Sequence, residues 1–329
     1  MGRRCPSTTG AGAGFTASGP TGADTVGVVA VDLNADLAEG EDLSAGDLAV
    51  LDSVTSASLA CGFHAGNRTL MRATAEAALG RGVVLGAHVS YRDRPGFGRR
   101  ALEVEPDRLT GDIVEQCGVL AGEVAVAGGS VEYVKPHGAL YNRMAVDPGV
   151  TAAVVEGVRR AGIGVLVAQP GTVAEDMAVR AGLRVVPEGF PDRGYRSDGR
   201  LADRGLPGAV IGEPGEVGRR AVSLARDGGL VALDGQWVAI GVETRCIHGD
   251  APGAGVTARR VRVALEERGV VVRPFIADGH TGRSRPRCPP GSSPSGTGPS
   301  WWRWTMSLPP TSWPPRSTVP APGAGPPGR

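Results

Sequence analysis

The sequence predicts an α/β protein whose repeated βα units close into a barrel. Short apolar runs rich in β-branched residues alternate with helical patterns along most of the chain, which is typical of a parallel sheet. Six of these runs end in a polar cluster, and a (β/α) barrel assembles its active site at such strand ends. An open doubly wound sheet is the alternative. It gathers its site at one switch point, so polar ends on six strands favour the barrel.

The first half of the chain contains four predicted strands and three predicted helices. The strands are 28–31, 57–60, 83–87 and 131–134, and the helices are 48–54, 69–79 and 106–126. Each strand is a short apolar run of the kind that forms a buried strand. The helix 69–79 is followed by Gly80 and Gly82, and glycine commonly ends a helix.

The second half continues this alternation. Its predicted helices are 150–161, 173–181, 214–226 and 256–268, and its predicted strands are 164–168, 183–186, 237–242 and 270–272. The helix 256–268 is amphipathic, as expected of a helix that covers a sheet.

Shifts in composition separate both ends of the chain from its centre. We expect residues 1–26 to form a disordered leader, because they are rich in small and polar residues and show no periodicity. Residues 27–275 form the predicted catalytic barrel domain. Residues 276–329 are dense in Pro, Ser, Gly and Arg and contain four of the five Trp residues without an apolar period, which predicts an unstructured tail.

The composition also argues against several partners and sites. The formal net charge of +1 gives no electrostatic reason to expect nucleic acid or an anionic membrane as partner. No run of 18 apolar residues predicts a transmembrane helix, and no compact apolar segment follows Arg3 and Arg4 to suggest a secretory signal. The five Cys residues are widely spaced without a C-x-x-C pair. This argues against a disulfide framework or a structural zinc site and fits a cytoplasmic protein.

The segment KPHGALYN at 135–142 holds the single lysine of a chain that otherwise uses arginine. The ammonium group of lysine is a compact charge whose pKa responds to burial, which suits it to proton transfer or to binding a developing anion. His137 lies two residues further on and apolar residues precede the segment, so we interpret Lys135 as functional.

Histidines and acids recur at the ends of the predicted strands. The histidines are His64, His88, His137 and His248, and the acids are Asp32, Asp36, Glu39, Asp192 and Asp250. Together they suit either a hydrolytic metal site or a metal-free acid–base site. Neither H-x-x-x-H nor H-E-x-x-H is present, so metal ligands would have to converge from different strands.

Two weaker signals have ordinary explanations. The glycines at 249–255 precede a helix and suit an anion, although a simple turn explains them as well. Cys61 and Cys246 lie near histidines, but a small buried residue explains each better than a nucleophile.

Six ordered motifs give the chain a resemblance to a known family. They are DLNAD at 32–36 with Glu39-Gly40, ACGFHAG at 60–66, GAH at 86–88, KPHGALY at 135–141, DRGY at 192–195 and CIHGD at 246–250. With this spacing the chain resembles the LamB/YcsF family over residues 28–275. The family usually has Asp at Asn67, Gly at Ala38 and Pro at Val89, and often Pro-Arg where Asp203-Arg204 stands.

The resemblance implies a (β/α) barrel of the glycoside hydrolase/deacetylase type with seven strands. It also implies cleavage of 5-oxo-L-proline to L-glutamate coupled to ATP hydrolysis, in a complex with B and C subunits. ATP would be a co-substrate bound by those partners, in agreement with the lack of a G-x-x-x-x-G-K-[ST] loop in this sequence.

The chemistry of lactam opening assigns roles to the matching residues. We expect Asp36 or His64 to be the base, Lys135 to offset the charge of the oxyanion or phosphate, and His137 to be the acid. The remaining residues are expected to bind substrate: Asn34, His88, Tyr141, Asp192, Arg193, Tyr195, His248 and Asp250.

Two other functions remain open. The first is a metal-dependent deacetylase or amidohydrolase that acts alone, with Asp36, His64 and His88 on one divalent ion. The second is a non-catalytic scaffold for the other subunits.

Overall fold

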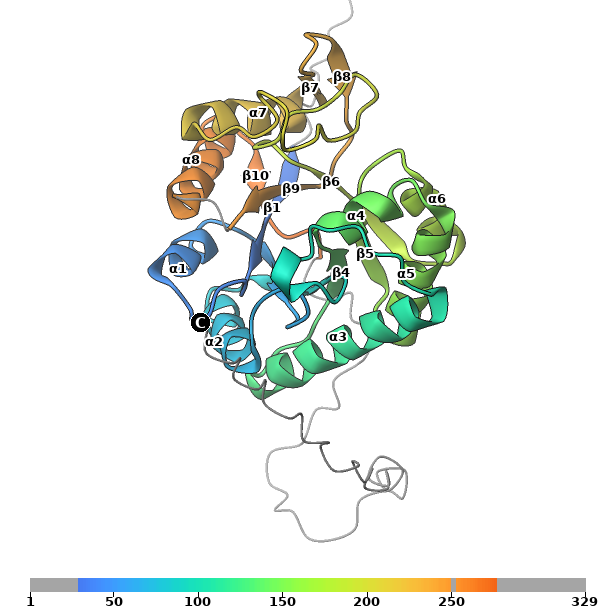
Figure 1. The fold of residues 1–329 in the computed structure, drawn as a ribbon. Helices are drawn as coiled ribbons and strands as arrows, with labels where there is room; N and C mark the ends of the chain where they lie inside the picture. The colour runs from blue at the N-terminus through green and yellow to red at the C-terminus, as the bar shows by residue number, and fades with distance from the viewer. Residues whose placement is uncertain (1–28, 250–252, 277–329) are drawn as a thin grey trace, which may run out of the picture. The chain divides into compact units, whose positions relative to one another are not determined.

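Seven parallel strands close into a barrel, which confirms the predicted fold class (Figure 1). The strands are β1 (Ala30–Leu37), β2 (Ser56–Ala60), β3 (Val84–Val89), β4 (Tyr133–Pro136), β5 (Val165–Ala168), β6 (Arg184–Gly189) and β9 (Thr244–His248). Each pairs with the next, and β9 closes the ring by pairing with both β6 and β1. The short strand β10 (Val271–Val272) pairs with the start of β1.

The computed structural model describes residues 29–249 and 253–276. The predicted leader, almost all of the predicted tail, and Asp250 lie outside these residues. Within them, no helix combines the length and apolar character needed to cross a membrane.

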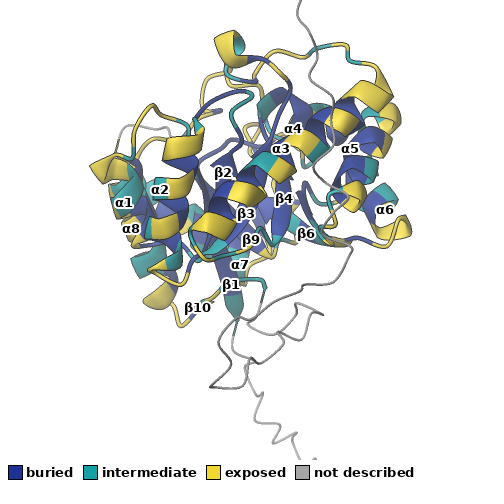
Figure 2. Ribbon diagram, turned by 90° about the horizontal axis from the view of Figure 1, so that it is seen from below, coloured by how far each residue is buried: buried dark blue, intermediate teal, exposed yellow. Residues whose placement is uncertain are grey.

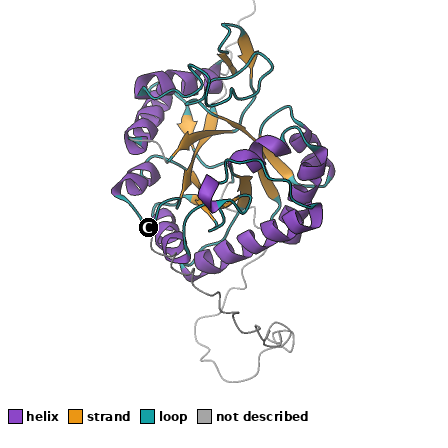
Figure 3. Cartoon of the chain, viewed as in Figure 1, coloured by secondary structure: helices purple, strands orange, loops and turns teal. Residues whose placement is uncertain are grey.

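Helices surround the barrel, as Figure 3 shows. They are α1 (Ala45–Leu51), α2 (Arg68–Leu79), α3 (Pro106–Val126), α5 (Pro148–Arg160), α6 (Val173–Arg180), α7 (Pro214–Arg226) and α8 (Ala254–Glu266). The short helices α4 (Gly138–Met144) and η1 (Arg94–Gly96) were not predicted. The bounds of α3 and α7 match the prediction, because a proline at the first helical turn marks where each begins.

The core lies between the strands and the inner faces of these helices (Figure 2). Amphipathic helices bury one face in this way and leave the opposite face to solvent. The strands are buried almost throughout, as expected for a parallel sheet covered by helices.

The first strand is longer than predicted, and this changes the position of its polar residues. Residues 32–36 were expected to follow a strand that ended at Val31, but β1 continues to Leu37. Asp32, Asn34 and Asp36 therefore alternate along the strand and are buried. Hydrogen bonds from Asn34 to Glu188 and Thr244 cross to β6 and β9, so this face of β1 points into the barrel.

The prediction of a barrel strand at 237–242 is wrong. Residues Trp237–Ala239 form β8, which pairs antiparallel with β7 (Gly229–Val231) in a separate hairpin. The barrel strand is β9, whose sequence TRCIH lacks a long apolar run. It is buried because it pairs with both β1 and β6, and its Arg245 donates to the carbonyl oxygen of Leu224 at 2.9 Å, a partner that local pattern does not reveal.

Candidate active site

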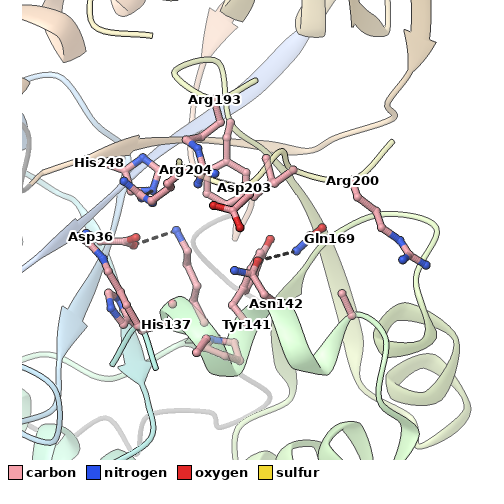
Figure 4. Close-up of a pocket in the computed structure, with 18 of the residues that line it drawn as sticks. Asp36, His137, Tyr141, Asn142, Gln169, Arg193, Arg200, Asp203, Arg204 and His248 are labelled. Carbon is pink, nitrogen blue, oxygen red and sulfur yellow. Dashed lines mark hydrogen bonds and ion pairs between the residues drawn. The ribbon is translucent and has the colours of Figure 1, made fainter. Parts of the chain in front are cut away.

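A cavity of about 510 Å³ lies at the C-terminal ends of the barrel strands. Its lining includes Asp36, Glu39, His88, Lys135, His137, Tyr141, Asn142, Gln169, Phe190, Arg193, Arg204 and His248. Figure 4 shows Asp36, His137 and Tyr141 on one side of this space and Arg193, Arg204 and His248 on another. The strand ends therefore converge on one polar cavity, as the barrel topology predicts.

Lys135 is held at the floor of the cavity by acceptors from three strands. Its Nζ lies 2.8 Å from Asp36 Oδ1 and 2.7 Å from Glu188 Oε1. It also lies 3.1 Å from both Asn34 Oδ1 and Cys246 Sγ. Burial by itself would lower the pKa of Lys135, but Asp36 and the other acceptors outweigh this and raise it well above its usual value. Lys135 is therefore a permanent cation.

Asp36 bridges this lysine and the histidines. Its Oδ2 lies 3.3 Å from His88 Nε2, while Oδ1 faces Lys135. Burial acts to raise the pKa of Asp36, yet His88 and Lys135 outweigh it and hold the pKa well below the usual range. The side chain is a carboxylate at neutral pH.

Three histidines and Glu39 form a second group beside Asp36. Ligand atoms of Glu39, His64, His88 and His137 all lie within 4.8 Å of one another. Glu39 Oε1 is 3.2 Å from His64 Nε2 and 3.3 Å from His137 Nδ1, and His137 Nδ1 is 2.9 Å from His88 Nε2. These atoms could hold a metal ion. The expected metal set was Asp36, His64 and His88. The group in the structure joins these two histidines to Glu39 and His137, while Asp36 Oδ1 faces Lys135.

Burial and neighbouring groups act in opposite directions on the pKa values of His64 and Glu39. Burial lowers the pKa of His64 to about 4, although Glu39 acts against it. The pKa of Glu39 lies far below its usual value because the adjoining rings of His137 and His64 outweigh the opposing effect of burial. The acid is therefore ionised beside the rings.

His248 lies across the cavity and is oriented by Asp192. Asp192 Oδ2 accepts from His248 Nδ1 at 2.6 Å, which leaves Nε2 free to accept from Arg204 Nη2 at 3.0 Å. Phe190 stacks on the same ring with centroids 5.6 Å apart. This arrangement presents an arginine and an aromatic face to a ligand.

Several residues expected to bind substrate form hydrogen bonds with other residues of the site. Asn34 lies beneath Lys135, and Asp192 holds His248. The hydroxyl of Tyr195 accepts from the Phe190 amide at 2.8 Å, and its side chain is outside the cavity lining. Arg193 reaches the lining, but it donates to the carbonyl oxygens of Ala202 and Ala209. Among the described members of that set, His88, Tyr141, Arg193 and His248 line the cavity.

Some cavity residues were not singled out from the sequence. Gln169 and Phe190 directly follow β5 and β6, and Arg99 and Arg204 come from loops. Glu188, near the end of β6, was also missed; it contacts Lys135 but is not part of the cavity lining. The strand-end rule that drew attention to the histidines applied equally to Glu188. The loop arginines carry no comparable local signal.

Comparison with known proteins identifies the family. The family model described as LamB/YcsF family matches residues 31–279. The chain belongs to the LamB/YcsF family.

Relatives within the LamB/YcsF family match nearly their whole length. A protein of Streptomyces griseus, named as the A subunit of 5-oxoprolinase, is 49% identical over 248 residues, which are 74% of this chain and 99% of that protein. One of the same name from Mycobacterium avium is 47% identical over 248 residues, covering 74% and 98%. The crystal structure of the lactam utilization protein from Thermus thermophilus is 42% identical, with a TM-score of 0.71, and covers 75% of this chain and 100% of that one.

The structure shows the surroundings of two residues that depart from the pattern expected of the LamB/YcsF family. Ala38, where Gly is usual, has a φ of 60°, the left-handed region that favours glycine. Asn67, where Asp is usual, begins α2: its Oδ1 accepts from the Leu70 amide and its Nδ2 donates to the Glu41 carbonyl, both at 2.9 Å. Asp and Asn cap helices equally well, so Asn67 keeps this structural role away from the cavity lining.

Proposed function

We propose that this chain is the A subunit of an ATP-dependent 5-oxoprolinase, which opens the lactam of 5-oxo-L-proline to give L-glutamate together with B and C subunits. The names of the close relatives support the substrate. The observation that carries the proposal is the buried, permanently charged Lys135 facing Asp36 at the end of the barrel. Such a pair suits a reaction that develops negative charge on a carbonyl oxygen.

The chemistry of the lactam explains why ATP is needed. The amide of a five-membered lactam is stabilised by resonance, so water opens it slowly at neutral pH. Phosphorylation of its carbonyl oxygen would remove this resonance, so that water adds to the ring carbon. Departure of the ring nitrogen then leaves an acyl phosphate, from which a second water releases phosphate to give L-glutamate. We place ATP binding and this activation on the partner subunits, because the sequence contains no P-loop.

Within the cavity, we assign the reacting groups to Asp36 and Lys135. Asp36 takes a proton from the attacking water and returns it to the departing ring nitrogen, and Lys135 offsets the charge on the former carbonyl oxygen or its phosphate. Tyr141, His88 and His248 contact the substrate, with Arg204 available to an anionic group.

The acid role expected of His137 does not fit its surroundings as well. Its Nε2 donates to the carbonyl oxygen of Phe97 at 2.9 Å, and its Nδ1 faces His88. His64, the alternative base, is outside the cavity lining. We therefore propose that His64 and His137 orient Glu39 and His88 through their contacts, and that Asp36 carries out the proton transfer.

The test is glutamate release from 5-oxoproline and ATP, measured with the purified chain alone and mixed with candidate B and C subunits. We expect glutamate only in the complete mixture. Release by the chain alone without ATP, or none from a mixture whose partners hydrolyse ATP, would contradict the proposal.

A second function is favoured by one observation. The group of Glu39 and three histidines suits a metal-dependent amidohydrolase or deacetylase that acts without partners. A screen of amides and acetylated substrates with added divalent metals, in the absence of ATP, separates this function from the first. The scaffold alternative predicts that Asp36→Asn leaves glutamate release by the full mixture unchanged.

A cytoplasmic location remains a prediction.

A further inference from the structure

Glu39, His64, His88 and His137 bring four polar atoms together inside the barrel mouth. The three histidines are buried, and Glu39 is nearly so, with its side chain 9% exposed. They come from four successive stretches of chain: the loop after β1, the loop after β2, β3, and the residue after β4. A buried polar cluster requires a donor for every acceptor, so the protons in it can be counted.

Hydrogen bonds to backbone carbonyl oxygens determine the tautomers of His88 and His137. His88 Nδ1 lies 3.0 Å from the carbonyl oxygen of Lys135, and His137 Nε2 lies 2.9 Å from that of Phe97. A carbonyl oxygen only accepts, so both of these nitrogens carry protons. In neutral rings, His88 Nε2 and His137 Nδ1 then face each other at 2.9 Å with lone pairs only.

The tautomer of His64 follows from Ser90. The Ser90 hydroxyl donates to the carbonyl oxygen of Tyr91 at 2.9 Å, so its oxygen must accept from His64 Nδ1 at 2.8 Å. His64 Nε2 therefore also points a lone pair at Glu39 Oε1, 3.2 Å away. With neutral rings, three imidazole lone pairs therefore converge with the carboxylate of Glu39, and Asp36 Oδ2 also lies 3.3 Å from His88 Nε2.

Adding protons to the rings is an unfavourable way to remove the repulsion between these facing acceptor atoms. One added proton satisfies either the contact between His88 and His137 or that between His64 and Glu39, so at least two are required. Whichever of His88 and His137 is protonated together with His64, two imidazolium rings then lie with centroids 4.0–5.5 Å apart, since His64 stacks on His137 and meets His88 edge-on. A single divalent cation satisfies all four acceptors at once.

We propose that Glu39, His64, His88 and His137 bind one divalent first-row transition-metal ion. Tetrahedral bonds of about 2.0–2.1 Å place neighbouring ligand atoms roughly 3.3 Å apart. Four of the six separations between ligand atoms are 2.9–3.7 Å, which bracket that value, and all six are within 4.8 Å. Imidazole nitrogens select zinc and its neighbours in the periodic table over magnesium.

The surroundings of the cluster also fit a metal site. The second nitrogen of each histidine is bound to a carbonyl or hydroxyl oxygen, which is how ligating histidines are oriented. Glu39, His88 and His137 line the cavity, so the ion would be accessible from it. When bound, it would supply Lewis-acid chemistry to an oxygen of the ligand in the cavity.

The test titrates the chelator-treated full chain with Zn²⁺ by calorimetry and follows Co²⁺ binding by its visible absorption. We expect one ion per chain, an intense Co²⁺ band typical of four-coordination, and no competition from Mg²⁺. Glu39→Gln and His88→Gln should weaken Zn²⁺ binding by more than about 100-fold, beyond the roughly 10–100-fold expected for Ser90→Ala, which removes only an orienting group.

His248→Gln is the matched control, because it makes the same change in the same cavity outside the cluster and should leave Zn²⁺ affinity unchanged. No binding by the chelator-treated wild type, or equal affinity in His88→Gln and His248→Gln, would overturn the proposal. If a cluster variant fails to fold by circular dichroism, the stoichiometry and Co²⁺ spectrum of the wild type decide. No lactam, ATP or partner is used, so this result is independent of the proposed reaction.

Discussion

At the scale of single residues, the barrel interior is organised around one buried cation. Lys135 faces two carboxylates, Asp36 and Glu188, both buried within the strands. Removing charges from water is costly, and attraction repays this only when each charge keeps its partners. Lys135 therefore contributes both to the stability of the protein at the floor of the cavity and to the reaction proposed there.

Replacing Lys135 tests both roles together. Lys135→Met should reduce glutamate release by the full mixture by at least about 100-fold, because it removes the charge that faces the oxyanion. It should also cost roughly 3–5 kcal/mol of stability, since Asp36 and Glu188 remain buried without a cation. Activity is measured with the partner subunits, and stability by urea denaturation.

A double variant separates the two effects. The double variant Lys135→Met/Glu188→Gln also removes one of the two carboxylates that the single variant leaves without a cation. It should recover part of the stability without recovering glutamate release. Recovery of both would mean that the single variant had lost activity only through misfolding.

At the scale of secondary-structure elements, small residues allow the strands to close around large side chains. Gly86 in β3 lies against the ring of Tyr133 in β4, and a Cβ placed there would be 2.2 Å from that ring. Tyr133 is fully buried, and its hydroxyl lies 3.2 Å from Ser58 Oγ in β2. The ring thus occupies space across the barrel that Gly86 leaves open.

Two glycine substitutions of opposite effect test this packing. Gly86→Ala should destabilise the protein by about 1–3 kcal/mol, because the added methyl group overpacks the interior. Gly118→Ala in α3 should stabilise it by about 0.5–1 kcal/mol, since the site is exposed, no atom lies within 4 Å, and alanine favours a helix. Thermal or urea denaturation of both variants is the measurement, and a neutral Gly86→Ala would contradict the packing argument.

At the scale of the whole barrel, closure of the ring buries Asp32, and the surrounding hydrogen bonds only partly stabilise its ionised form. Asp32 accepts from the hydroxyls of Thr55, Ser56 and Thr244, which link β1 to its two neighbours β2 and β9. Burial nonetheless raises the pKa of Asp32 from 3.8 to about 6. The stability of the closed ring should therefore depend on pH through this residue.

The sign of the dependence follows from proton uptake. Between pH 3.8 and about 6 the folded protein retains a proton on Asp32 that the unfolded chain has released, so stability falls as pH rises through this window. Relative to Asp32→Asn, the wild type should lose about 3 kcal/mol of stability between roughly pH 3.5 and pH 7. Urea denaturation of both proteins at several pH values measures this difference, and a constant difference would show that the pKa is not raised.

Much of the fold could be read from local pattern. The alternation of strands and helices, the bounds of α3 and α7, and the polar strand ends were all predicted, because periodicity and turn signals act over short stretches of chain. The same reasoning failed at 237–242, where an apolar run forms a hairpin, and at β9, whose buried Arg245 finds its partner in α7.

The sequence by itself determined the barrel class and most of the residues that converge at its mouth, including Lys135 and the four histidines. Only the tertiary structure decided how they divide into groups. It turned Asp36 toward Lys135, brought Glu39 to His64 and His137, and placed Asn34 beneath the cavity. The physical reason is that strand register and ring closure set the distances between side chains from different strands, and no local pattern encodes those distances.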